Sequence, residues 1–278
     1  MFKKGLCQGN LRRDLDPREA LGKAAERGFH GIELSLNGEG RTGLAAPYDE
    51  PDRAAELARS LGLELPSTMG PGFLDLFHLE LEESLPQIIA RTERGLQAAR
   101  ALGATAILQI PGYVQVVWDP RSPIVPYDVA YDRSLAIYRE LAKVAEKHQV
   151  TLCVENVWNR FLLSPLEMRS FVDAIGNPYV KAYFDVGNVL FSGFPEQWIQ
   201  ILGSRIERVH LKDFRTAVGN LQGFVTLLEG DVNWRAVMSA LRETGYTGYL
   251  TAEYGPYGHC PDVLLDHLSA SMDALIAL

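Results

Sequence analysis

Four short apolar runs in the second half of the sequence each end on, or close to, a side chain that can bind a metal ion. Glu155 follows the run LCV, Asp185 closes AYFD, His210 lies near the end of RVHL, and Glu253 follows LTA. Three carboxylates and one imidazole suit a hard or borderline divalent ion such as Mn²⁺, Mg²⁺ or Co²⁺, whereas structural zinc favours thiolates. Any one of these acids alone is more simply a helix cap or a salt-bridge partner. The metal hypothesis therefore depends on all four residues meeting in space.

A regular alternation along the chain predicts the elements that must position these residues. Short apolar runs typical of strands alternate with longer amphipathic runs typical of helices, and Ser164 followed by Pro165 marks a helix start. Strands that alternate with helices imply a parallel sheet. The expected strands lie at 3–9, 31–36, 63–69, 105–112, 150–156, 180–188, 206–214 and 248–254. The expected helices lie at 17–27, 50–60, 84–101, 127–148, from 164 onward, and at 195–203, 233–244 and 262–277.

Eight strand–helix units in 278 residues favour a closed (β/α)8 TIM barrel, with residues 1–278 as a single domain. A doubly wound open sheet is the alternative, but no GxGxxG motif follows the first expected strand. No linker rich in Pro, Gly or Ser divides the chain. Residues 112–127 form a long loop, which is either a lid or an ordinary surface excursion.

A barrel of this type forms its active site at the carboxyl ends of the strands, where the four candidate ligands would meet. Alternation along each strand agrees with this arrangement. If Glu155 faces the interior, so does Cys153, while Leu152 and Val154 face the helices. The apolar neighbours then fall on the side that packs against helices.

Further polar residues near expected strand ends are candidates for binding substrate. Glu33 either binds substrate or fills a structural position, and Gln109 is a candidate to hydrogen-bond a substrate hydroxyl. Asn188, like Asn156, either orients ligands through hydrogen bonds or caps a loop. Lys212 and Arg215 are further candidates, and a solvated or salt-bridged role is the alternative for each. The predicted substrate-binding set is Glu33, Gln109, Asn188, Lys212 and Arg215.

The composition limits the partners and the location of the chain. A formal net charge of -8 argues against nucleic acid as a partner, because phosphate binding needs a basic face. No run approaches the roughly 20 apolar residues of a membrane span, and the N-terminus does not resemble a signal peptide. Three widely spaced cysteines favour a reducing compartment, so a cytoplasmic protein is expected.

As a set, the segments CVENVWNRF, YFDVGN, RVHLKDF and LTAEY resemble the metal-ligand strands of the xylose isomerase-like barrel superfamily. They are most similar to those of the ketose 3-epimerases, such as tagatose and psicose 3-epimerases, and of related sugar-phosphate epimerases. The resemblance covers the whole chain as eight units, and its specific part runs from Glu155 to Glu253. It implies a small-molecule sugar substrate and one divalent ion, Mn²⁺ before Co²⁺ or Mg²⁺, with a possible homo-oligomer. The implied ligands are Glu155, Asp185, His210 and Glu253.

The resemblance also implies that Glu155 and Glu253 form the acid–base pair. An ion chelated by a ketose carbonyl and its neighbouring hydroxyl acidifies the C–H between them. One carboxylate then removes the proton and the other returns it on the opposite face, which inverts the centre. Return of the proton to the neighbouring carbon would instead give an aldose–ketose isomerisation.

The sequence departs from the 3-epimerase pattern at two positions that hold substrate in those enzymes. The glutamate expected after NRF is replaced by the run Phe161-Leu162-Leu163, and Asn188 stands where a histidine is expected. The identity of the sugar and the carbon acted on therefore stay open, with a slight preference for free over phosphorylated sugars. Dehydratases and hydroxypyruvate-type isomerases of the same barrel are alternatives. A non-catalytic sugar-binding barrel is a third, although it would not need two opposed bases.

Overall fold

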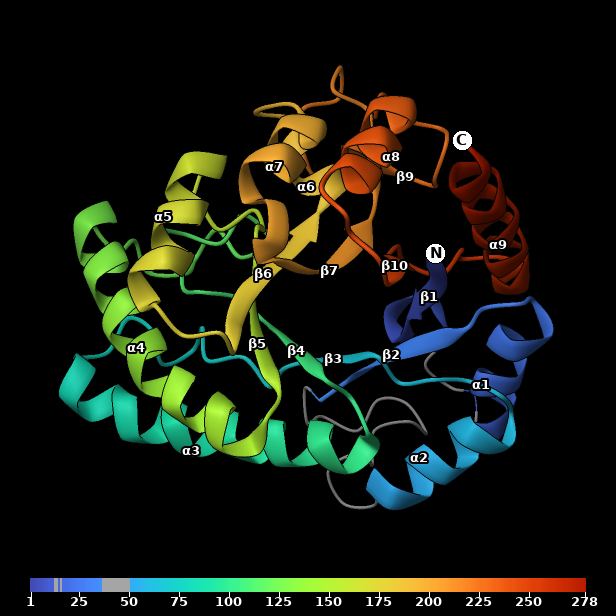
Figure 1. Cartoon of the computed structure of the whole chain (residues 1–278). Coiled ribbons are helices and arrows are strands. Elements are labelled where there is room, and N and C mark those ends of the chain that lie inside the picture. Colours follow the sequence, from blue (N-terminus) through green and yellow to red (C-terminus); the bar gives the residue numbers. More distant parts are fainter. Residues whose placement is uncertain (13–14, 16, 37–50) are drawn as a thin grey trace.

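The computed structural model describes residues 1–12, 15, 17–36 and 51–278. In this part of the chain eight parallel strands close a barrel in the order β1, β10, β7, β6, β5, β4, β3, β2 (Figure 1). The predicted TIM barrel is therefore confirmed. The barrel strands are β1 (Lys3–Cys7), β2 (Gly31–Ser35), β3 (Ser67–Met69), β4 (Ala106–Gln109), β5 (Thr151–Glu155), β6 (Val180–Asp185), β7 (Ile206–Leu211) and β10 (Tyr249–Ala252).

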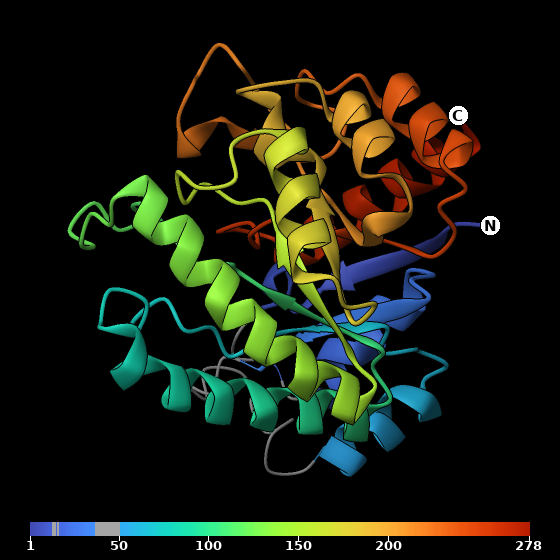
Figure 2. The same cartoon turned by 60° about the vertical axis from the view of Figure 1, so that its left-hand side comes forward.

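Helices cover the outside of the barrel, and the two long helices α3 and α4 lie along one side of it (Figure 2). Ser164 begins α5 as predicted, because its side chain accepts a hydrogen bond from the Glu167 backbone N–H. Gly103 and Gly176 end α3 and α5 in the left-handed conformation that glycine adopts readily. The helices are α1 (Pro17–Glu26), α2 (Pro51–Ser60), α3 (Leu81–Leu102), α4 (Tyr127–His148), α5 (Pro165–Ile175), α6 (Val186–Leu190), α7 (Pro195–Leu202), α8 (Trp234–Glu243) and α9 (Pro261–Ala277).

Alternation along the strands divides the buried residues into two groups. Leu152 and Val154 belong to the large core between the sheet and the helices. Cys153 lies in a separate small cluster with Ala106, Leu108 and Tyr183 inside the barrel. This is the division that the alternation of β5 predicts, and it directs Glu155 toward the barrel axis.

The predicted strand at 63–69 is shorter in the structure. Only Ser67–Met69 forms β3, and Glu64 makes an isolated bridge to Gly31. Pro66 lies between them and has no N–H to donate to a sheet, which explains why the ladder is interrupted there.

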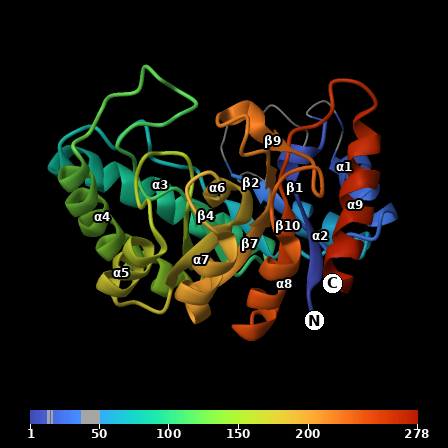
Figure 3. The same ribbon diagram turned by 90° about the horizontal axis from the view of Figure 1, so that it is seen from above.

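Among the described residues, the loops that follow β4, β5, β7 and β10 lie at one end of the molecule, opposite the N-terminus (Figure 3). Between β7 and α8 the chain forms a small antiparallel pair, β8 (Asp213–Phe214) and β9 (Phe224–Val225). The loop before α4 is held to the loop after β5, since the Val114 and Val117 backbone N–H groups donate to Asn159 O and Trp158 O at 3.0 Å. Among the described helices, none combines the length and apolar character needed to cross a bilayer.

Candidate metal centre

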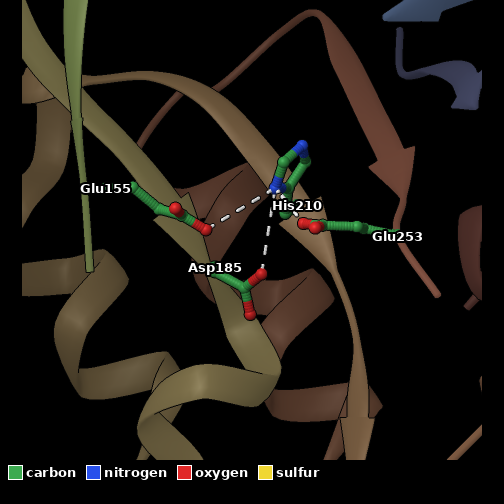
Figure 4. Close-up of side chains that lie close together, drawn as sticks. All are labelled: Glu155, Asp185, His210 and Glu253. Carbon is green, nitrogen blue, oxygen red and sulfur yellow. Dashed lines mark ion pairs between the residues drawn. The ribbon is translucent and has the colours of Figure 1, made fainter. Parts of the chain in front are cut away.

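The structure brings the four predicted ligands together at the carboxyl ends of neighbouring strands. Glu155, Asp185, His210 and Glu253 each offer one ligand atom, and these atoms lie within 4.8 Å of one another. His210 Nδ1 is 3.9 Å from Glu155 Oε1, 3.8 Å from Asp185 Oδ2 and 2.6 Å from Glu253 Oε2. Figure 4 shows Glu155 and Glu253 entering from opposite sides, with His210 and Asp185 between them.

Asp185 is oriented by hydrogen bonds at the start of α6. Its Oδ1 accepts from the Asn188 backbone N–H at 2.9 Å, which leaves Oδ2 directed at His210. The Asn156 amide pairs with the backbone of Asp185, donating to its carbonyl at 2.8 Å and accepting from its N–H at 2.9 Å. Asn188 in turn donates through its side chain to Asn156 O at 3.0 Å. Both asparagines therefore hydrogen-bond to Asp185, which is a geometry that suits the ligand-orienting role predicted for them.

His210 is oriented by Glu33, which is completely buried. His210 Nε2 lies 2.7 Å from Glu33 Oε1, so that Nδ1 faces the other three ligands. Glu33 Oε2 accepts hydrogen bonds from Ser67 Oγ and Tyr183 OH, both at 2.6 Å. A carboxylate behind a histidine in this way sets the ring orientation and the tautomer for metal binding. Glu33 thus lies behind the candidate ligands, and both of its carboxylate oxygens already have hydrogen-bond partners within the protein.

The other predicted substrate-binding residues lie at different distances from the centre. Lys212 Nζ lies 3.0 Å from Asp185 Oδ2 and 2.9 Å from Glu253 Oε2, within the cluster itself. Arg215 is exposed on the excursion after β7, and its Nε donates to Glu229 O at 3.1 Å.

Gln109 points in a direction that the sequence did not indicate. Leu108 faces the barrel interior, so Gln109 takes the opposite, helix-facing side of β4 with Ile107. Its side chain is buried next to Gly70, where an added Cβ would approach Oε1 to 2.5 Å. This placement does not support the predicted contact with a sugar hydroxyl.

The residues that sequence reasoning missed are Ser67 and Tyr183, which hold Glu33. Tyr183 precedes Asp185 by two positions on β6 and so shares its face, which was the available signal. Nothing local to Ser67 indicates its role, because the residue it serves belongs to a different strand.

Burial sets the protonation behaviour of two of the candidate ligands. It raises the pKa of Glu155 and of Asp185 above their ordinary values, because a buried carboxylate loses its hydration. Glu253 differs: burial also favours its neutral form, but Lys212 and His210 hold its pKa below the ordinary value. The two carboxylates that flank the centre are therefore unequal as proton acceptors.

The anionic surroundings of the centre favour the charged forms of His210 and Lys212. Burial alone would lower the pKa of His210, but the anionic groups around it raise that pKa well above 6.5. Burial likewise opposes the charge of Lys212, and Asp185, Glu253 and Glu155 raise its pKa well above 10.5.

The donor atoms fit a divalent cation. Asp185 Oδ2, His210 Nδ1 and Glu253 Oε2 are buried and converge on one point; they make ion pairs with one another and with Lys212 but no well-aligned hydrogen bond. Buried polar atoms without a hydrogen-bond partner are costly. An ion bound to these three atoms and to Glu155 would satisfy them.

Comparison with known proteins identifies the class to which this fold and site belong. The sequence matches the xylose isomerase-like TIM barrel family over residues 21–273. The chain belongs to this family.

Individual relatives match over shorter segments. An uncharacterized protein of Methanocaldococcus jannaschii, MJ1311, is 24% identical over 65% of this chain and 61% of its own length. An inosose dehydratase of Yersinia enterocolitica is 29% identical over 46% of this chain and 49% of its own length. The chain thus spans about half to three fifths of the curated relatives it matches.

Solved structures match over nearly the whole chain. The D-allulose 3-epimerase of a Methylomonas species has a TM-score of 0.77 at 17% identity, covering 99% of this chain and 98% of its own. The IOLI protein, crystallised with a zinc atom, has a TM-score of 0.81 at 15% identity and the same coverage of 99% and 98%. At this level of identity the likeness shows a shared fold.

Proposed function

We propose that the chain is a divalent-metal-dependent epimerase or isomerase acting on a small sugar. The observation that supports this most is the arrangement of Glu155 and Glu253 on opposite sides of Asp185 and His210 (Figure 4). The oxygen-rich ligand set favours Mn²⁺, with Co²⁺ and Mg²⁺ as alternatives. The zinc atom in the IOLI structure is consistent with a divalent ion in this fold.

The mechanism assigns a proton-transfer role to each flanking carboxylate. An ion held by Glu155, Asp185, His210 and Glu253 would polarise the substrate carbonyl and lower the energy of an enediolate. Glu155 approaches the centre from one side, where its carboxylate is placed to take up a proton as a general base. Glu253 approaches from the other side, so a proton removed on one face can be replaced on the other.

The remaining contacts with substrate would come from the mouth of the barrel. Lys212 is 16% exposed beside the ligands, and Arg215 lies on the exposed excursion after β7. In contrast, Glu33 and Asn188 are assigned to holding His210 and Asp185, because their hydrogen bonds are made within the protein.

A dehydratase is the second candidate, favoured by the similarity to an inosose dehydratase. It would use the same ion and the same removal of a proton next to a carbonyl. The difference lies in the second step, where a hydroxyl leaves from the neighbouring carbon instead of a proton returning.

The test is hydrogen exchange in D₂O. Mn²⁺-loaded protein is incubated with free and phosphorylated ketoses and with a keto-inositol, and NMR follows deuterium. Deuterium at C3 with formation of the epimer would establish the epimerase, and label at C1 or C2 an isomerase. Loss of water with an unsaturated or deoxy product would establish the dehydratase instead.

The matched variants separate catalysis from folding. E155Q and E253Q should each lose at least about a hundredfold of the exchange rate, the usual contribution of a general base. E93Q carries the same substitution on α3 and should exchange like the wild type. Exchange that survives in both E155Q and E253Q would contradict the assigned roles.

A further inference from the structure

Lys212 is an unusual neighbour for a set of metal ligands, because it brings a positive charge to the place where a cation should bind. It follows β7 directly, two residues after His210, and so lies on the same side of the strand. Its ammonium bridges Asp185 Oδ2 at 3.0 Å and Glu253 Oε2 at 2.9 Å. These are two of the atoms that converge to form the candidate metal centre.

The competition between Lys212 and a metal ion is sharpest at Asp185. Asp185 Oδ1 is engaged by the Asn188 N–H at 2.9 Å, so Oδ2 is the oxygen left for any cation. Asp185 and Glu253 are 0% and 20% exposed, and charges in such a site are screened less than surface charges. An ammonium and a divalent ion placed a few ångströms apart on shared oxygens repel each other.

The backbone keeps Lys212 close to the centre. Gly187 lies against it, and a Cβ added there would approach Lys212 Cβ to 2.6 Å. The ammonium also lies 5.9 Å from the centre of the Phe224 ring on β9. The side chain is 16% exposed and carries the ammonium on a flexible four-carbon stem.

From these contacts we infer that Lys212 is a resident counter-ion of the metal centre, which stabilises the metal-free ligands and competes with the incoming divalent ion. This inference rests on the proposed function only in taking the four residues as the ligands. The consequence is a centre that stays assembled without metal and binds it more weakly than its ligand set would allow.

The test compares K212M, K212Q and K4M with the wild type. Lys4 is a matched control, because it is a buried lysine paired with Asp273 at 2.8 Å and with Ser269 at 3.0 Å, on β1 away from the centre. Dissociation constants for Mn²⁺ and Zn²⁺ are measured by calorimetry, and unfolding temperatures with a chelator. Removal of the charge should tighten metal binding about tenfold or more in K212M and K212Q. The metal-free unfolding temperature should fall in these variants, and K4M should bind metal like the wild type.

A second measurement uses the unmodified protein, so that the inference does not depend on a variant that folds. Amine acylation is followed by mass spectrometry with and without Mn²⁺. Lys212 labelling should increase when the ion is added, because the ammonium is displaced, whereas Lys4 labelling should not change.

The outcomes separate this inference from the proposed function. Wild-type binding with no gain in K212M and K212Q would overturn the counter-ion role and leave the metal centre intact. Binding by K212M but not by the wild type would support the counter-ion role and contradict a metal-dependent activity. Failure of the wild type and of all three variants to bind metal would overturn both.

Discussion

Glu33 determines which nitrogen of His210 faces the candidate metal centre. Its Oε1 pairs with Nε2 at 2.7 Å, and its Oε2 is held by Ser67 and Tyr183 at 2.6 Å each. These four side chains come from four strands, β2, β3, β6 and β7, and every atom of Glu33 is buried. The orientation of one ligand therefore depends on a hydrogen-bonded chain that crosses the barrel.

The substitution E33Q should weaken metal binding without unfolding the protein. A glutamine has one acceptor oxygen, so its amide N–H₂ must face either His210 or the two hydroxyl donors. Loss of such a carboxylate partner typically costs about 10–100-fold in metal affinity. Calorimetric titration with Mn²⁺ would measure this loss of affinity.

The control is S67A, which removes one donor to Glu33 and leaves its charge, so it should reduce metal affinity less than E33Q does. An E33Q affinity equal to that of the wild type would show that Glu33 does not orient His210.

At the scale of elements, the outer helices are joined by ion pairs as well as by the apolar core. Glu93 of α3 contacts two residues of α4, Lys147 Nζ at 2.7 Å and His148 Nε2 at 3.0 Å. Hydrogen bonds from these two groups lower the pKa of Glu93 below its ordinary value of 4.5. The contact thus links the two long helices on one side of the barrel (Figure 2).

This pair should make a small, pH-dependent contribution to stability. A carboxylate whose folded pKa is lowered stabilises the fold above its unfolded pKa, and the contribution is lost as pH falls through the lower folded value. E93Q should therefore be less stable than the wild type by about 1 kcal/mol or less near neutral pH. The difference should fade below the ordinary pKa of 4.5. Urea unfolding at several pH values would measure it, and a difference that persists unchanged in strong acid would rule out the ion pair as its cause.

At the scale of the whole molecule, the barrel and its ligand-bearing strand ends were predictable from sequence, whereas the contacts between strands were not. The alternation of apolar and amphipathic runs identified eight units, and Glu155, Asp185, His210 and Glu253 stood out as polar residues that end apolar strands. These signals are local, because each depends on a few consecutive residues.

Two features of the site were not readable from the sequence, each for a physical reason. Before Gln109, β4 has apolar residues on both faces, as parallel strands in a barrel do, so its sequence does not show which face carries Gln109. The hydrogen bond between Glu33 and His210 joins residues 177 positions apart. It forms only because closure of the barrel sets the relative register of β2 and β7, which no local pattern shows. By contrast, Pro66 was a readable signal, since a proline weakens any strand assigned across it.

Because the four candidate ligands come from β5 and β6, from β7 and from the first residue after β10, a bound ion would join half of the barrel and should stabilise the whole fold. At a free Mn²⁺ concentration about 100 times the dissociation constant, the gain is about 2.7 kcal/mol. For a chain of this length that corresponds to a rise in unfolding temperature of about 5 °C. Differential scanning calorimetry with Mn²⁺, and then with excess chelator, would measure the rise and its reversal.

The control for this measurement is D185N, because asparagine can still cap α6 by accepting from the Asn188 N–H while its side chain loses the charge that an ion needs. The variant should fold and show little or none of the rise. An equal rise in D185N and in the wild type would place the ion elsewhere in the molecule. No rise in the wild type at saturating Mn²⁺ would remove the metal centre, since an ion that binds only the folded state must stabilise it.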